Sequence, residues 1–194
     1  MDDFDIYLAS TSPRRRELLQ QIGVRYCLVK GDISEIPRPD EAARDYVLRM
    51  AIEKAQAGKG HIDASGHQPV LGADTEVVVD NEIFGKPRNK AHGLAMLERL
   101  SGRTHEVISA VALVGESVTT RLNVSQVSFR PTRAAEREKY WQTGEPLDKA
   151  GAYGIQGMAA IFICGLQGSY SAVMGLPLYE TAELLQAAGI RPLG

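Results

Sequence analysis

Apolar and polar residues recur with two different periodicities along this 194-residue chain, one typical of helices and the other typical of strands. Apolar residues three and four positions apart favour helices, whereas short alternating or continuous apolar runs favour strands. Helices are expected near residues 13–22, 41–57, 90–100, 133–141 and 177–188. Strands are expected near residues 6–9, 26–30, 69–73, 75–79, 83–84, 107–114, 118–129 and 159–164. The interleaved order, with one long antiparallel pair in the middle, predicts an α/β protein with a mixed central sheet.

Several residues mark where these elements begin and end. Ser12, Asp40 and Thr132 are expected to be the N-caps of the first, second and fourth helices. Gly23 is expected to end the first helix, and Asp80-Asn81 has the composition of a tight hairpin turn. No internal repeat interrupts this pattern, so the chain is expected to form one domain over residues 1–194.

Composition narrows the classes of partner. The 22 basic and 24 acidic residues give a formal net charge of −2, which argues against nucleic acid as the main partner. Cys27 and Cys164 belong to no C-x-x-C pair, so a reducing cytosol is expected. Acidic Asp2 and Asp3 stand where a secretory signal would be basic, and no apolar run is long enough to span a membrane. We therefore expect a cytoplasmic protein with no membrane partner.

The beginning of the first helix carries the first candidate chemistry. Arg14, Arg15 and Arg16 follow directly after the hydroxyls of Ser10 and Ser12. Cations at this end oppose the helix dipole, so their presence favours an anion that binds between them. Guanidinium groups, hydroxyls and the backbone of a helix start together suit a polyphosphate. The alternative is a solvated basic face without a ligand.

A second group follows the third predicted strand run. Asp74 is flanked by the small residues of Gly72-Ala73 and by Thr75, which would let a ligand approach the backbone. The segment Gly85-Lys86-Pro87-Arg88 could return two cations to the same neighbourhood. Carboxylates that hold a divalent metal and cations that neutralise phosphates are typical of phosphoryl chemistry. The alternative is that Asp74 is a turn or cap residue and that the cations are surface charges.

A third group lies in the glycine-rich stretch 144–157. Four glycines in this stretch permit positive φ angles and a close approach to a flat ligand. The amide of Gln156 could pair with a base edge, and Tyr153 could either stack on a base or anchor the loop in the core.

Taken together and in order, these segments resemble the Maf nucleotide pyrophosphatases. The matching runs are Leu8–Arg15, Gly72–Thr75, Gly85–Arg88, Asp148–Gly157 and Val173–Leu178. The resemblance implies a fold similar to the inosine triphosphate pyrophosphatases, with a twisted mixed sheet and two lobes around a cleft. It also implies a homodimer that hydrolyses a nucleoside triphosphate to monophosphate and pyrophosphate with a divalent cation, Mg²⁺ or Mn²⁺.

The branch of the family that acts on dTTP and UTP is matched at three positions. This chain has Arg14, Thr75 and Gln156 where that branch has Arg, Thr and Gln. The branch that hydrolyses 7-methyl-GTP has Trp, Gln and Glu there, although Thr11 and the last four residues, 191–194, look more like that branch. The expected substrates are therefore dTTP and UTP. The alternatives are a 7-methyl-GTP pyrophosphatase and a nucleotide-binding regulator of cell division with little turnover.

The resemblance also assigns roles. Asp74 resembles the proton acceptor, and Arg14, Thr75 and Gln156 resemble the positions that set specificity. Arg15, Lys54 and Lys86 would spread the charge of the triphosphate, and Glu35 with Asp74 would hold the metal. Glu35 could instead be only a loop carboxylate, and Lys54 only the solvated end of an amphipathic helix. The three segments around Arg14, Asp74 and Gln156 are expected to share one crevice.

Overall fold

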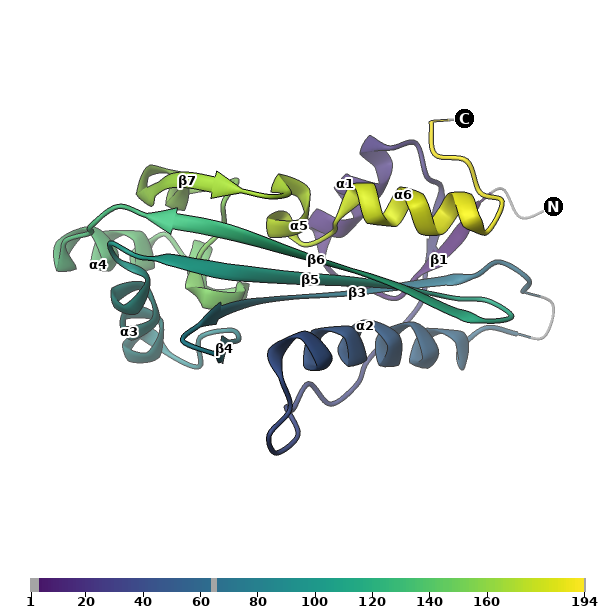
Figure 1. Cartoon of the computed structure of the whole chain (residues 1–194), viewed down its shortest axis with the longest axis horizontal. Helices are drawn as coiled ribbons and strands as arrows, with labels where there is room; N and C mark the ends of the chain where they lie inside the picture. The colour runs from purple at the N-terminus through teal and green to yellow at the C-terminus, as the bar shows by residue number, and fades with distance from the viewer. Residues whose placement is uncertain (1–3, 64–65, 194) are drawn as a thin grey trace. The chain divides into compact units, whose positions relative to one another are not determined.

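The structure, a computed structural model, describes residues 4–63 and 66–193 (Figure 1). Its helices are α1 (Pro13–Gln21), α2 (Ala43–Lys59), α3 (Lys90–Leu100), α4 (Ala134–Gln142), α5 (Tyr170–Met174) and α6 (Leu178–Ala187). Its strands are β1 (Ile6–Leu8), β2 (Tyr26–Leu28), β3 (Val70–Val79), β4 (Glu82–Phe84), β5 (Thr104–Val114), β6 (Val118–Phe129) and β7 (Ile163–Gln167). Asp2, Asp3 and the last residue of the segment 191–194 lie outside the described residues.

The strands of the described residues form one mixed sheet in the order β2-β1-β3-β5-β6-β7, with β4 paired to β3. β1 runs parallel to both β2 and β3, whereas β4 is antiparallel to β3 and β7 is antiparallel to β6. The α/β class with a mixed sheet is therefore confirmed. No helix of the described residues is both long and apolar enough to cross a membrane.

The chain divides into two compact units. Unit 1 contains Met1–Asp74, Ser109–Asn123 and Gly175–Gly194, and unit 2 contains Thr75–Ile108 and Val124–Met174. The strands β3, β5 and β6 contribute residues to both units. The division falls directly after Asp74, so the predicted site residues are distributed between the two units.

In unit 1, helix α2 packs closely against strand β3. Tyr46, Val47, Met50, Ala51 and Ala55 form the buried stripe of this helix, which recurs at helical spacing. Gly72 of β3 lies so close to α2 that an added Cβ would be 2.3 Å from the backbone oxygen of Ala51. The glycine is therefore what allows helix and strand to approach each other. Figure 1 shows α1 and α6 on the face of these strands opposite α2.

Unit 2 has its own apolar core. It contains residues of β3 to β6, of α3 and α4 and of the loop after α4, among them Val79, Leu97, Val107, Phe129 and Tyr153. Helices α3 and α4 contact each other directly. Gly93 of α3 lies so close to the Trp141 ring of α4 that an added Cβ would be 2.1 Å from it. This core fixes the loop that carries Gln156.

Most helix ends agree with the prediction, but two caps were assigned wrongly. Helix α2 follows Ala42 at the N-cap, and Asp40 lies two residues earlier with φ of 56°. The N-cap of α4 is Arg133 rather than Thr132. Ser12 does occupy the N-cap of α1, but its side chain makes no capping hydrogen bond.

The predicted turn at Asp80-Asn81 is confirmed, whereas two elements in the last third of the chain differ from the prediction. Asp80 and Asn81 both have positive φ, 52° and 63°, as a type I′ hairpin turn requires. The strand expected at 159–164 is instead a 3₁₀ turn, Met158–Phe162, followed by β7. Helix α5 was not predicted, because a five-residue helix gives too short an apolar pattern to recognise.

Candidate active site

Asp74 lies inside β3 and is only 4% exposed. The strand is buried along almost its whole length, and the Asp74 side chain is buried with it. A carboxylate in such a place needs a positive or hydrogen-bonding partner, because burying an unpaired charge is very costly. The alternative that Asp74 is a turn or cap residue is therefore wrong, since it lies within a regular strand.

The partner of Asp74 is Lys54 of helix α2. Its Nζ lies 2.7 Å from Oδ1 of Asp74 and 2.8 Å from Oε1 of Glu35. Lys54 is 9% exposed, and it faces the sheet because it follows Met50 by four residues and Ala51 by three. Lys54 is thus not the solvated end of the helix. It joins two of the predicted carboxylates in one cluster within unit 1, Glu35-Lys54-Asp74, in which Lys54 and Asp74 are buried and Glu35 is exposed.

The second carboxylate oxygen of Asp74, Oδ2, is buried and accepts no hydrogen bond from any described residue. An orphaned buried oxygen of this kind suits a water molecule or a hard cation. Mg²⁺ is typically held by one or two carboxylates together with waters and substrate phosphates. The described residues contain no group of three His, Cys, Asp or Glu residues that could hold a metal alone. The donors present therefore fit a cation that shares its ligands with a phosphate.

Arg15 is held in a defined orientation at the beginning of α1. Its Nε donates to the backbone oxygen of Gly175 at 2.8 Å, and its Nη1 donates to Oγ of Ser10 at 3.3 Å. Ser10 Oγ also accepts from the backbone N–H of Ser12 at 3.2 Å. Ser10, Ser12 and Arg15 are therefore linked by hydrogen bonds. Gly175 belongs to the matching run 173–178, but no feature of that run predicts a hydrogen bond from its backbone oxygen to Arg15.

The predicted site residues divide between the two units. Unit 1 holds Ser10, Ser12, Arg14, Arg15, Glu35, Lys54 and Asp74. Unit 2 holds Thr75, Lys86 and Gln156. Lys86 is exposed in the loop between β4 and α3.

In unit 2, Gln156 is exposed whereas the five residues before it, 151–155, are all buried. Gly151 of this loop donates its backbone N–H to the oxygen of Gly85, at 3.2 Å, and so links two of the matching runs. Gly144 and Gly151 have φ of 78° and 68°, as expected for glycine-dependent turns. The loop thus projects the Gln156 side chain from a fixed base.

Tyr153 is part of that base. Its ring is buried against Phe129, with ring centroids 4.9 Å apart, and its hydroxyl is 2.8 Å from Nε2 of His105. Burial raises the pKa of Tyr153 and lowers the pKa of His105 to about 4. Tyr153 is therefore a core anchor, and the alternative in which it stacks on a base is wrong.

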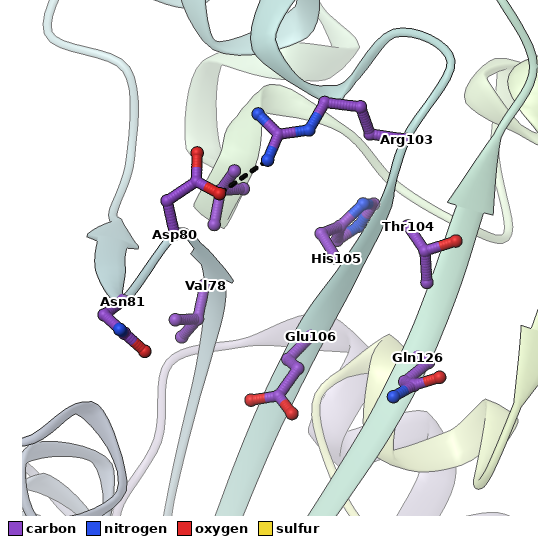
Figure 2. A pocket seen from close by; sticks show the side chains of 9 residues that line it. Val78, Asp80, Asn81, Arg103, Thr104, His105, Glu106 and Gln126 are labelled. Carbon is purple, nitrogen blue, oxygen red and sulfur yellow. Dashed lines mark hydrogen bonds and ion pairs between the residues drawn. The ribbon is translucent and has the colours of Figure 1, made fainter.

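A pocket of about 240 Å³ also lies in unit 2 (Figure 2). Its lining includes Asp80, Arg103, His105, Glu106 and Gln126. Asp80 and Arg103 are ion-paired at 2.6 Å, and this hydrogen bond holds the pKa of Asp80 below its usual value. None of the predicted site residues lines this pocket.

Known proteins are similar to this chain over nearly its whole length. Residues 5–188 match the model of a family described as Maf-like protein. The chain belongs to the Maf-like family. A relative from Alkalilimnicola ehrlichii, named dTTP/UTP pyrophosphatase, is 56% identical over 93% of this chain and 91% of its own length. A relative of the same name from Methylococcus capsulatus is 52% identical over 97% of this chain and 93% of its own length.

One solved structure also resembles this Maf-like chain. It is described as a nucleoside-triphosphatase or dITP/XTP pyrophosphatase from Mycobacterium abscessus. It has a TM-score of 0.47 and 20% identity, and it covers 94% of this chain and 93% of that one. The fold assignment above rests on the strands of the Maf-like chain itself.

Proposed function

We propose that this chain hydrolyses dTTP and UTP to the monophosphate and pyrophosphate. Support comes from the relatives that are about half identical over nearly the whole chain and are named dTTP/UTP pyrophosphatase. The observation that carries the chemistry is the buried Asp74 carboxylate. One of its oxygens is paired with Lys54, and the other accepts no hydrogen bond from the described residues.

In the proposed reaction, Asp74 accepts a proton from a water molecule. The water oxygen attacks the α-phosphorus, and the bond from that phosphorus to the bridging oxygen breaks. Pyrophosphate leaves with the electron pair of the broken bond. Oδ2 is the oxygen that can receive the proton, because Oδ1 already accepts from Lys54.

The cations have complementary tasks in this proposal. Lys54 compensates the charge of Asp74, and Arg15 meets a phosphate with the guanidinium edge that Ser10 and Gly175 orient. Arg14 and Lys86 add positive charge for the triphosphate, and Ser12 adds a hydroxyl. When bound, a divalent cation neutralises phosphate charge and makes the attacking water more acidic.

We assign base recognition to Arg14, Thr75 and Gln156. The amide of Gln156 has one donor and one acceptor group, which match N3–H and O4 of uracil or thymine. A base edge that does not match the amide in its held orientation leaves the amide unpaired, which weakens the binding of that base. The exposure of Gln156 above a buried base of residues supports this role.

We further propose that the cation is Mg²⁺ or Mn²⁺, held by Asp74 and Glu35 together with phosphate oxygens. A homodimer stays a prediction of the resemblance, and a single domain over residues 1–194 and a cytoplasmic location stay predictions of the sequence. Sedimentation of the purified chain would test the dimer, which should have twice the mass of one chain.

The test of the proposed function is pyrophosphate release from dTTP, UTP, CTP, GTP and 7-methyl-GTP, with Mg²⁺, with Mn²⁺ and with excess chelator. We expect the fastest release from dTTP and UTP, and none after chelation. Release confined to 7-methyl-GTP would assign the chain to the other branch. Tight binding of nucleotides without release would instead favour a regulator.

A further inference from the structure

We propose that Glu145 is a positioning residue that sets base discrimination by holding the loop that presents Gln156. This inference rests on the proposed function, because it concerns which base that same site prefers. Glu145 was not among the residues singled out from the sequence. It stands at the beginning of the short turn Glu145–Asp148, which follows α4.

The carboxylate of Glu145 ties together residues on both sides of Gln156. It accepts a hydrogen bond from the hydroxyl of Tyr140 at 2.7 Å and from the backbone N–H of Met158 at 2.8 Å. The backbone N–H of Ala159 is a third, longer donor at 3.5 Å. The side chain of Glu145 therefore spans thirteen positions of sequence and closes the loop at its far end.

Tyr140 extends this network to the near side of Gln156. Its hydroxyl oxygen accepts from the backbone N–H of Gly154 at 3.3 Å while its proton goes to Glu145. Burial, followed by the hydrogen bond to Glu145, raises the pKa of Tyr140, so the hydroxyl keeps its proton. Gly154 and Met158 flank Gln156 by two residues on each side, and both are fixed through one carboxylate.

Two glycines of this loop, Gly154 and Gly157, lie directly against the side chains of Lys149 and Glu145. A Cβ on Gly157 would lie 2.3 Å from both carboxylate oxygens of Glu145. A Cβ on Gly154 would lie 2.8 Å from Cε of Lys149, whose Nζ donates to the backbone oxygen of Glu145 at 2.8 Å. Glycine at both positions therefore leaves the space in which the Glu145 and Lys149 side chains lie against the loop. The arrangement indicates a loop built around this side chain.

Charge and geometry make a glutamate specifically suitable. Three N–H and O–H donors converge on two carboxylate oxygens, and each oxygen can accept more than one hydrogen bond. A glutamine would place an NH₂ group against one of these donors, so that contact would be lost. Since precise placement of Gln156 decides which base edge it matches, loosening the loop should reduce discrimination between bases.

The experiment compares the wild-type chain with Glu145→Gln, Tyr140→Phe and the matched control Glu138→Gln. Glu138 lies on α4 in an exposed ion pair with Lys90, away from this network. The measured quantity is kcat/KM for UTP divided by kcat/KM for CTP and for GTP. Equilibrium binding of the same three nucleotides and hydrogen exchange of the Gly154 and Met158 amides accompany it.

We expect the UTP preference to fall at least tenfold in Glu145→Gln and less in Tyr140→Phe, with faster exchange at both amides and no change in Glu138→Gln. If Glu145→Gln slows all three nucleotides by one common factor and keeps the preference, the inference is overturned. If the wild-type chain binds but hydrolyses none of them, the proposed function fails. The binding preferences and amide exchange then still decide the role of Glu145.

Discussion

The ammonium of Lys54 lies 2.7 Å from Oδ1 of Asp74, and both side chains are almost completely buried. A buried pair of this kind contributes little net stability, because removing both charges from water costs about as much as their attraction returns. Its retention is therefore better explained by chemistry: Lys54 keeps a negative oxygen inside the strand, with Oδ2 left for a reacting water or a cation.

Asp74→Asn should remove pyrophosphate release while leaving the protein folded. The amide has the size of the carboxylate and can still accept from Lys54, but it cannot take up a proton from water. We expect the rate with UTP to fall at least about 100-fold, the effect typical of losing a general base. Thermal unfolding checks that the fold is kept. Asp80→Asn, at an exposed hairpin turn, is the matched control and should retain the wild-type rate.

Lys54→Met should destabilise the protein, because it leaves Asp74 buried without its cation. Breaking one side of a buried ion pair typically costs 3–5 kcal/mol, and we expect about 3 kcal/mol in urea unfolding at neutral pH. The double variant Lys54→Met, Asp74→Asn should recover a large part of this loss. Losses that simply add in the double variant would show that the two charges are not coupled.

Gly72→Ala tests whether the close approach of β3 and α2 positions the site. A Cβ at residue 72 would be 2.3 Å from the backbone oxygen of Ala51 and 2.7 Å from the backbone nitrogen of Ala55. Backbone atoms cannot rotate away, so we expect a loss of about 1–3 kcal/mol and slower hydrolysis as Lys54 moves from Asp74. Gly85→Ala is the control for stability, since its Cβ would meet nothing within 4 Å; its change should stay within about 0.5 kcal/mol.

The local rules of the sequence predicted the elements well where a long periodic pattern existed. Helix α3 has the predicted bounds, and the Asp80-Asn81 turn has the positive φ angles that its composition favours. The rules failed at Asp40 and Thr132, where a good capping residue stands near the helix but the helix begins after Ala42 and Arg133 instead. Capping preference is a local energy of about 1 kcal/mol, and packing of the helix decides its exact start.

The candidate site was less accessible to such rules. Spacing along the chain places Lys54 on the buried stripe of α2, but it does not show that the charged end is buried too, because a lysine at such a position usually keeps its charge in water. The pairing depends on contacts between residues 20 positions apart. Likewise, Glu145 lies outside the predicted set, because its hydrogen bonds to Tyr140 and Met158 arise only when the loop is folded. Motif resemblance located the segments, and the structure supplied the partners.

His105 should make the protein less stable as the pH falls. Its ring is buried with Nε2 bonded to Tyr153, and desolvation together with Arg103 lowers its pKa to about 4, from 6.5 for an ordinary histidine. Between these two values the unfolded chain binds a proton that the folded chain does not, so stability rises with pH across this window and is lost as the pH falls from 6.5 to 4. From pH 7 to pH 5 this one group should remove about 2 kcal/mol.

The measurement for His105 is the free energy of unfolding in urea at pH 7, 6 and 5, for the wild-type chain and for His105→Gln. Glutamine can keep a hydrogen bond to Tyr153 but does not titrate, so its stability should fall by about 2 kcal/mol less over this range. The exposed His61 provides the matched control, and His61→Gln should follow the wild-type curve. Parallel curves for the wild type and His105→Gln would show that another group governs the acid sensitivity, because removing the buried imidazole would then have changed nothing.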